Sequence, residues 1–116
     1  MQNINVKEEF ANWLKTSNYD GPINITAKFY VKEDQVSKFC EIMKTVVEYS
    51  NTDHAALMYK MYVDYKDPSV FWFIEEWKSV DDLKKHIMDE KHVKDYKLIS
   101  ELLRAPTHIA LYKPLD

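Results

Sequence analysis

Cysteine and glycine are almost absent from this chain of 116 residues, which has one of each. The single cysteine, Cys40, excludes a disulfide within the chain and any zinc site built from several cysteines. The single glycine, Gly21, excludes the glycine-rich loops in which the backbone approaches a phosphate closely. Common nucleotide-dependent chemistry is therefore not expected.

Long apolar runs and clusters of basic residues are also missing. No stretch approaches the roughly 20 apolar residues that a membrane helix needs, and the first residues lack the basic and apolar regions of a secretory signal. Lysine and arginine are spread along a chain of net charge −3, which leaves no electrostatic footprint for nucleic acid. We therefore expect a cytoplasmic protein that binds neither membranes nor nucleic acid.

Hydrophobic residues, in contrast, make up 46% of the chain, a fraction typical of a folded globular domain. The apolar spacing of residues 5–15 predicts an amphipathic helix, and a turn rich in Ser, Asn, Asp, Gly and Pro follows it. We expect residues 1–20 to form an N-terminal helical extension and residues 21–116 to form the main domain. Phe10 and Trp13 should pack against that domain or against a second subunit.

In the main domain, segments with an apolar residue at every second position, which predict strands, alternate with segments whose apolar residues recur every 3.6 positions, which predict helices. The expected elements are strand 23–31, helix 33–49, strands 55–65 and 70–77, helix 80–89, a helix from 91 onward, and strand 107–112. This β-α-β-β-α-α-β order predicts an α+β, ferredoxin-like fold with a four-stranded antiparallel sheet and helices on one face. Large side chains on both faces of the central hairpin predict that a second subunit covers the other face.

Candidate site residues gather where the third expected strand ends and a helix begins. Phe73, Glu75 and Trp77 share one strand face because side chains alternate with a period of two, so a carboxylate lies among aromatic rings. Ser79, with Asp82 three residues later, resembles a capping box and predicts where the helix begins.

The carboxylate of Glu75 must be paired or protonated if it is buried, because an isolated charge is strongly disfavoured in an apolar interior. Basic side chains on neighbouring strands could pair with it: Lys28, Lys60 and His108. We favour this structural role, an ion pair at the subunit interface, over a catalytic one.

Two histidines follow the strand. His86 lies on the apolar side of its helix, where a structural histidine and a catalytic one are about equally expected. His92 comes six residues later, on a different face of an uninterrupted helix, but a break near Asp89 would bring the two together. The i, i+4 spacing of a helical two-histidine metal site is absent, so no metal site is expected.

Taken together, residues 23–103 resemble the antibiotic biosynthesis monooxygenase family. The matching features are the segment ITAKFYVKED, Tyr59, Asp67–Pro68, the aromatic–Glu–Trp series of Phe73, Glu75 and Trp77, Leu83, His86 and His92. Members of this family are small ferredoxin-like domains that pair as homodimers, packing two sheets into an α/β barrel. A haem-degrading subgroup shares the fold, but its signature residues are not preserved here.

The resemblance implies a cofactor-independent monooxygenase that acts on a small aromatic or quinol-like substrate. Such chemistry needs an apolar pocket, a base for a phenolic proton and donors for the resulting oxyanion. His86 would be the base or an orienting donor and His92 a second polar contact. The pocket wall would comprise Tyr59, Phe73, Trp77 and Tyr96. The alternative is a non-catalytic dimer, for small-ligand binding or stress response; it is favoured if neither histidine reaches a pocket.

Overall fold

The computed structural model describes residues 6–52 and 56–115. In chain order, its elements are α1 (Val6–Thr16), β1 (Ile23–Tyr30), the short 3-10 helix η1 (Glu33–Gln35), α2 (Val36–Thr52), β2 (Ala56–Val63), β3 (Val70–Trp77), α3 (Val80–Met88), α4 (Glu90–Ser100) and β4 (His108–Tyr112). The strands form one antiparallel sheet in the order β2-β3-β1-β4. The predicted ferredoxin-like arrangement with an N-terminal helix is therefore confirmed.

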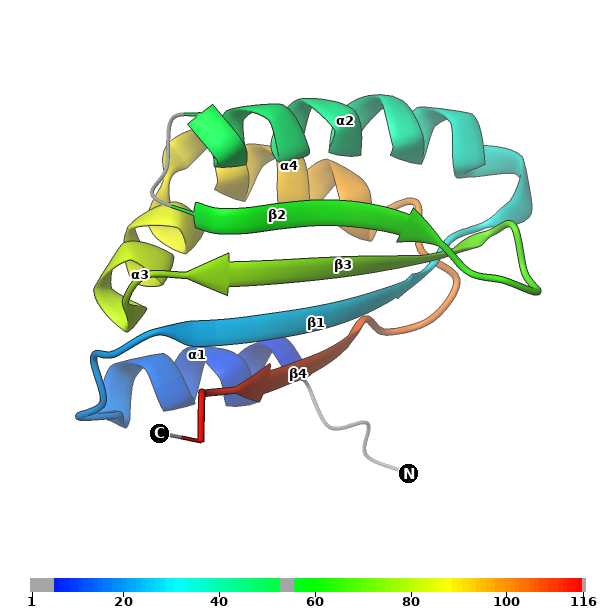
Figure 1. Ribbon diagram of the computed structural model, residues 1–116. Helices are drawn as coiled ribbons and strands as arrows, with labels where there is room; N and C mark the ends of the chain where they lie inside the picture. Colours follow the sequence, from blue (N-terminus) through cyan, green and yellow to red (C-terminus); the bar gives the residue numbers. More distant parts are fainter. Residues whose placement is uncertain (1–5, 53–55, 116) are drawn as a thin grey trace.

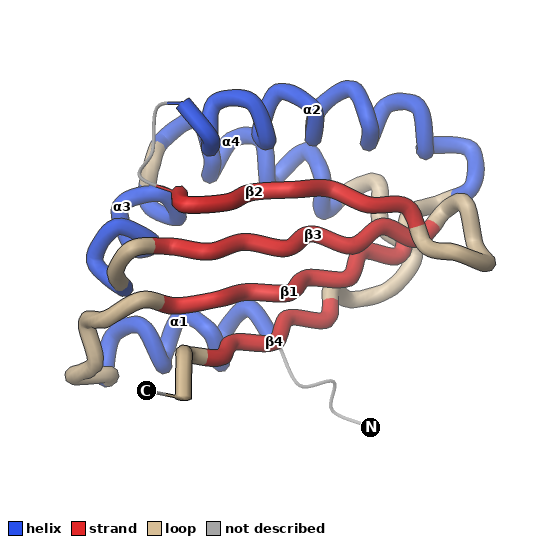
Figure 2. Tube along the Cα trace, in the orientation of Figure 1, coloured by secondary structure: helices blue, strands red, loops and turns tan. Residues whose placement is uncertain are grey.

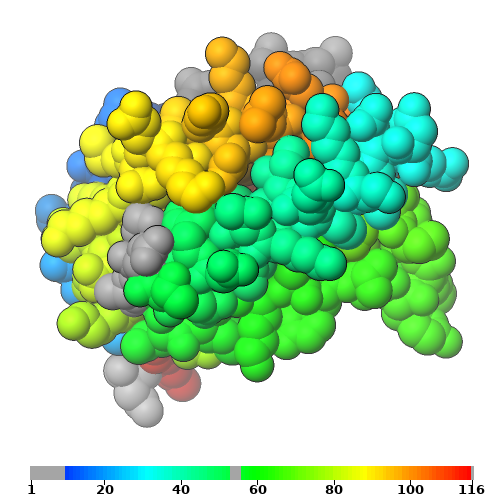
Figure 3. Space-filling model, turned by 90° about the horizontal axis from the view of Figure 1, so that it is seen from above, coloured from blue at the N-terminus to red at the C-terminus, as the bar shows by residue number. Residues whose placement is uncertain are grey.

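The helices cover one face of this sheet. In the view of Figure 1, α1 lies behind β1 and β4, whereas α2 runs along β2 with α4 beside it. Figure 2 shows the opposite, outer face of the strands toward the viewer, with no described helix across it. Seen from above, α2 and α4 pack side by side into one continuous layer (Figure 3). Within the described residues, we find no helix with the length and apolar character to span a membrane.

Alternating burial along the two central strands separates the inner face from the outer face. In β1 and β3 the inner residues are buried and most of the outer ones are half-buried, as the period of two predicts. Phe29 and Phe73 meet on the inner face with ring centroids 5.1 Å apart and rings nearly perpendicular. The core therefore lies between the sheet and the helices.

Side chains fix the ends of α3 and α4. The hydroxyl of Ser79 accepts a hydrogen bond of 3.1 Å from the backbone N–H of Asp82, so the predicted start of the helix is confirmed. Asp89 interrupts the helical run, and its carboxylate accepts bonds from the N–H groups of Lys91 and His92. The break predicted near Asp89 is confirmed, and it turns α4 relative to α3.

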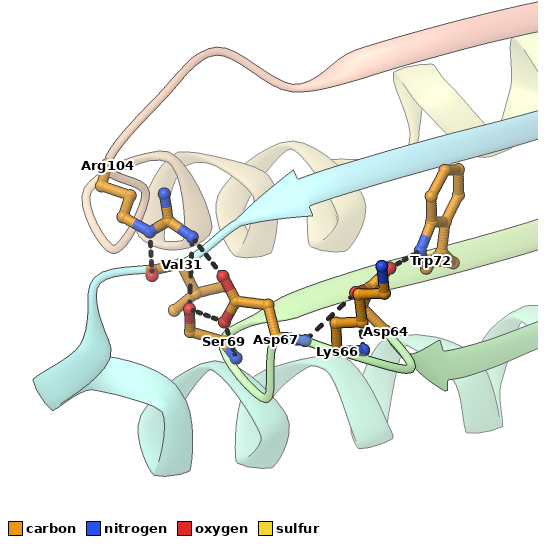
Figure 4. A network of polar contacts seen from close by, with 7 residues as sticks. All are labelled: Val31, Asp64, Lys66, Asp67, Ser69, Trp72 and Arg104. Atoms are coloured by element: carbon orange, nitrogen blue, oxygen red, sulfur yellow. Dashed lines mark hydrogen bonds and ion pairs between the residues drawn. The ribbon is translucent and has the colours of Figure 1, made fainter.

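A polar network links chain segments at the end of the sheet where a turn connects β2 and β3 (Figure 4). Asp67, in the turn between β2 and β3, accepts hydrogen bonds from the backbone and the hydroxyl of Ser69. Arg104, which follows α4, donates to the Asp67 carboxylate, to the Ser69 hydroxyl and to the carbonyl of Val31. The network thus joins the hairpin turn, the end of β1 and the segment leading to β4.

Candidate functional site

A cavity of about 180 Å³ lies between the inner face of the sheet and the helices. All four strands and all four α-helices contribute to its wall. Most of the lining is apolar, and the polar side chains in it are Tyr59, Glu75, His86, His92, Asp95 and Tyr96. An apolar space with a few convergent titratable groups is the usual form of a small-molecule site.

Glu75 brings a buried carboxyl group to this cavity. Only 7% of the residue is exposed, and its Oε1 accepts a hydrogen bond of 2.9 Å from the indole N–H of Trp77. Tyr59, directly opposite on β2, contributes a second side-chain hydrogen bond. Burial raises the pKa of Glu75 to about 7, although the two hydrogen bonds act in the lowering direction. The carboxyl group can therefore gain or lose a proton near neutral pH.

The structure corrects the ion pair expected for Glu75. All three proposed partners lie on the outer face, since Lys28 is opposite Trp72, Lys60 is opposite Ile74, and His108 is opposite Lys28. Glu75 points to the inner face, and the ion pairs among the described residues do not include it. Burial with two hydrogen-bond donors replaces the predicted salt bridge.

The two histidines meet beside Glu75 and its indole partner. The rings form a row in which Trp77 and His86 have centroids 4.6 Å apart, and His86 and His92 have centroids 4.3 Å apart. Tyr96 extends the row, stacked on His92 at 5.9 Å with an interplanar angle of 11°. His86 is only 2% exposed. Both histidines line the cavity.

The tyrosines of the cavity keep their protons at neutral pH. Burial raises the pKa of Tyr59, and the neighbouring Glu75 carboxyl raises it further. Burial also raises the pKa of Tyr96, opposed by a hydrogen bond with the Thr107 side chain. A neutral phenol group can donate a hydrogen bond to an oxyanion, so Tyr96 fits a role in holding a phenolate-like ligand, whereas the hydroxyl of Tyr59 is donated to Glu75.

The sequence-predicted site residues divide into two groups. Five of them line the cavity: Tyr59, Glu75, His86, His92 and Tyr96. Phe73 and Trp77 are fully buried and do not line it, so they support the wall from beneath instead of forming it. In the part of the chain that the structure describes, no three His, Cys, Asp or Glu side chains group closely enough to hold a metal ion.

Sequence reasoning did not place several wall residues in the site. Phe10 and Leu14 come from α1, Asp95 from α4 and Ile109 from β4. The apolar stripe of the N-terminal helix identifies Phe10 and Leu14 as packing residues, but no local signal shows that they reach a cavity. In the sequence, Asp95 has the i, i+4 spacing from Lys91 that is typical of a surface ion pair, and the structure forms that pair at 3.4 Å.

The model of the antibiotic biosynthesis monooxygenase family matches residues 22–97. A conserved protein from Methanosarcina mazei Go1 is 28% identical, with a TM-score of 0.76 over 79% of this chain and 91% of that one. A structure described as an antibiotic biosynthesis monooxygenase is 26% identical, with a TM-score of 0.77 over 81% and 99%. A structure from Caulobacter crescentus CB15, 15% identical, shares the fold at a TM-score of 0.80 over 84% and 93%. Comparison with curated proteins gives no match.

Proposed function

The chain belongs to the antibiotic biosynthesis monooxygenase family, and we propose that it is a cofactor-independent monooxygenase for a small aromatic or quinol-like substrate. The observation that carries the proposal is the cavity itself, in which a buried carboxyl, two histidines and two tyrosines converge within an apolar wall. Titratable side chains with shifted pKa values gather at functional sites, which favours an enzyme over a protein that only holds an apolar ligand.

A quinol can supply every electron that the reaction consumes. One atom of dioxygen enters the ring as a new oxygen substituent, and the other leaves as water. Of the four electrons that reduce dioxygen, two come from oxygenation of the ring carbon and two from oxidation of the quinol to the quinone. The protein must therefore hold the ring, remove a phenolic proton and stabilise the negative charge.

Glu75 is suited to remove that proton. An ionised carboxylate in an apolar wall is a stronger base than one in water, and a pKa of about 7 is close to the ideal for a general base at neutral pH. We assign to His86 the role of an orienting donor and to His92 that of a second polar contact. Tyr96 donates to the substrate oxygen, while Tyr59 and Trp77 donate to Glu75 and hold it in place.

Oxygen uptake with simple quinols tests the proposal. The protein should consume dioxygen in a quinol-dependent reaction and place one labelled atom from ¹⁸O₂ in the product, without releasing hydrogen peroxide. Glu75→Gln should lower kcat/KM by roughly 10²- to 10⁴-fold, the usual contribution of a positioned base, and His86→Ala by roughly 10²- to 10³-fold, the usual cost of removing one positioned donor. Lys85→Ala, on an exposed part of α3, is the control and should remain fully active.

Three results would count against these assignments. Saturable quinol binding without oxygen uptake would support the non-catalytic binding protein. Full activity of Glu75→Gln, with loss of activity in His86→Ala, would transfer the role of base to His86. Full activity of both variants would show that neither Glu75 nor His86 takes part in the reaction.

We also propose that two copies pair through the outer faces of their sheets. This face is rich in large side chains, which include Tyr30, Met58, Tyr62, Trp72, Ile74 and Tyr112. Trp72 is held in place by its N–H bond to Asp64 (2.9 Å, Figure 4) and by the ammonium of Lys28, 4.8 Å from the ring centroid. An ordered, aromatic, uncovered sheet face is suited to a second copy. Sedimentation at micromolar concentration should give twice the 13.9 kDa of one chain.

A further inference from the structure

Two side chains separate the central cavity from a second hollow. Phe10 and Ile109 line the cavity of about 180 Å³, and both also line a neighbouring cleft of about 510 Å³ between α1 and β4. The rest of the cleft wall includes Trp13 and Tyr19. Phe10 and Ile109 therefore form a partition between the two spaces.

The partition lies outside the part of the chain that matches the family model. That match covers residues 22–97, whereas Phe10 belongs to α1 and Ile109 to β4. Leu14, one helical turn after Phe10, is buried in the core and anchors α1 against the domain. The wall of the cavity on this side is thus supplied by segments beyond the matched region, while Glu75 and the two histidines lie within it.

The volume of the cavity limits what can occupy it. An engineered protein cavity of about 150 Å³ binds benzene, so a space of about 180 Å³ accepts a single ring with small substituents. Two or three fused rings need the additional space that lies beyond Phe10 and Ile109. The aromatic side chains of Trp13 and Tyr19 in the cleft make that space suitable for further rings.

We propose that Phe10, together with Ile109, sets the size limit of the site and restricts its ligands to single-ring phenols and quinols. The inference rests on the proposed function, since it concerns the same cavity and names the substrate class more narrowly. Phe10 acts here as a specificity-determining residue. Shortening its side chain joins the cavity to the cleft and admits fused rings, without altering Glu75, His86 or His92.

Anaerobic calorimetric titration tests the size limit without turnover. The probes are benzohydroquinone with one ring, naphthohydroquinone with two and anthrahydroquinone with three. The natural sequence should bind the single ring and bind the three-ring probe about tenfold or more weakly, the cost expected when extra atoms are forced into a packed interior. Phe10→Ala should reverse this preference, and Phe10→Leu should give an intermediate result.

Ile109→Ala provides a second test of the partition, and Trp13→Ala provides a control. Ile109→Ala opens the same partition from β4 and should shift the preference in the same direction as Phe10→Ala. Trp13→Ala removes a large side chain from the same helix but lines the cleft and not the cavity, so it should keep the natural preference for one ring. Circular dichroism reports whether each variant retains its helices.

The outcomes of these titrations either support or overturn the proposed size limit. Equal affinity of the natural sequence for all three probes would overturn the size limit, as would an unchanged preference in both Phe10→Ala and Ile109→Ala. Widened binding in Trp13→Ala would also overturn it, because general loosening of α1 would then explain the effect. In each of these cases the proposed function still stands if the protein turns over benzohydroquinone. If the natural sequence binds none of the three probes, both the size limit and the proposed function are contradicted.

Discussion

The imidazole rings of His86 and His92 have centroids 4.3 Å apart although they belong to different helices. The contact exists because Asp89 ends one helix and caps the next, which redirects the chain between the two histidines. An uninterrupted helix would place residues six apart on different faces. The short break is therefore what assembles this part of the site.

Replacing Asp89 should disturb stability and the site together. Asp89→Ala removes the acceptor for the N–H groups of Lys91 and His92, and it should lower the free energy of unfolding by about 1 kcal/mol. Quinol turnover should also fall, since His92 is no longer held beside His86. Urea unfolding and oxygen uptake measure the two effects. Asp89→Asn keeps an acceptor and should retain most of both; natural stability in Asp89→Ala would contradict the capping role.

Stability should depend on pH through Glu75. Its pKa is raised from 4.5 to about 7 by folding, so the folded state holds this proton more tightly than the unfolded state. The free energy of unfolding should therefore fall as pH rises through this window, by about 3 kcal/mol in all. Glu75→Gln should remove this loss and be more stable than the natural sequence at pH 8, as measured by urea unfolding.

A neighbouring glutamate provides the control for that experiment. Glu76→Gln removes the same charge one position further along β3, on the outer face, and should leave the pH dependence in place. If Glu75→Gln follows the natural sequence at every pH from 4 to 8, the carboxyl is not held in an environment that disfavours its charge.

Arg104 should matter more than an ordinary surface cation. Its Nε donates to the carbonyl of Val31, which is fully buried, and Arg104→Met leaves this acceptor without that donor. The expected loss is about 1–2 kcal/mol. Lys85→Met breaks an exposed ion pair with Asp81 and should cost less than about 0.5 kcal/mol. Comparable losses in the two variants, measured by urea unfolding, would show that the network in Figure 4 adds nothing beyond surface charge.

A charge on the outer face should prevent pairing of two copies. Ile74 is half-buried near the middle of this face, opposite Thr26 on one side and Lys60 on the other. Ile74→Glu should sediment as a monomer at concentrations where the natural sequence is dimeric, because burying an unpaired carboxylate is costly. Val93→Glu, at an exposed position on α4, should remain dimeric. A dimeric Ile74→Glu variant would exclude this face as the interface.

Local patterns were sufficient to predict the fold. The third strand begins at Val70 and ends at Trp77 as its alternation predicts, and α3 begins at Val80 because Ser79 caps it. The largest differences lie at the ends of the helix predicted over residues 33–49: its first three residues form η1 (Glu33–Gln35), and α2 continues to Thr52. At the end of β2, Tyr65 continues the predicted alternation beyond Val63 without a sheet partner, so periodicity alone does not mark where pairing stops; the predicted first residue, 55, lies outside the described residues.

The site was predictable only as far as local geometry determines it. His86 and His92 come together because the helix breaks at Asp89, and the sequence predicts this break. The surroundings of Glu75 depend instead on which strands pair and in which register, and this places Tyr59 opposite it. Phe10 reaches the cavity through the tertiary docking of α1, for which a stripe of apolar residues gives no direction.

The strand order β2-β3-β1-β4 has a consequence for synthesis of the chain. β1 leaves the ribosome early, yet its two partners are β3 and β4, which come much later in the sequence. At roughly 5–20 residues per second, translation from Tyr30 to Trp77 takes about 2–9 s. Throughout this interval the backbone of β1 has no sheet partner, and its inner residues, among them Ile25 and Phe29, have no neighbouring strand beside them. The nascent chain is therefore most exposed to aggregation and to capture by chaperones before β3 is complete.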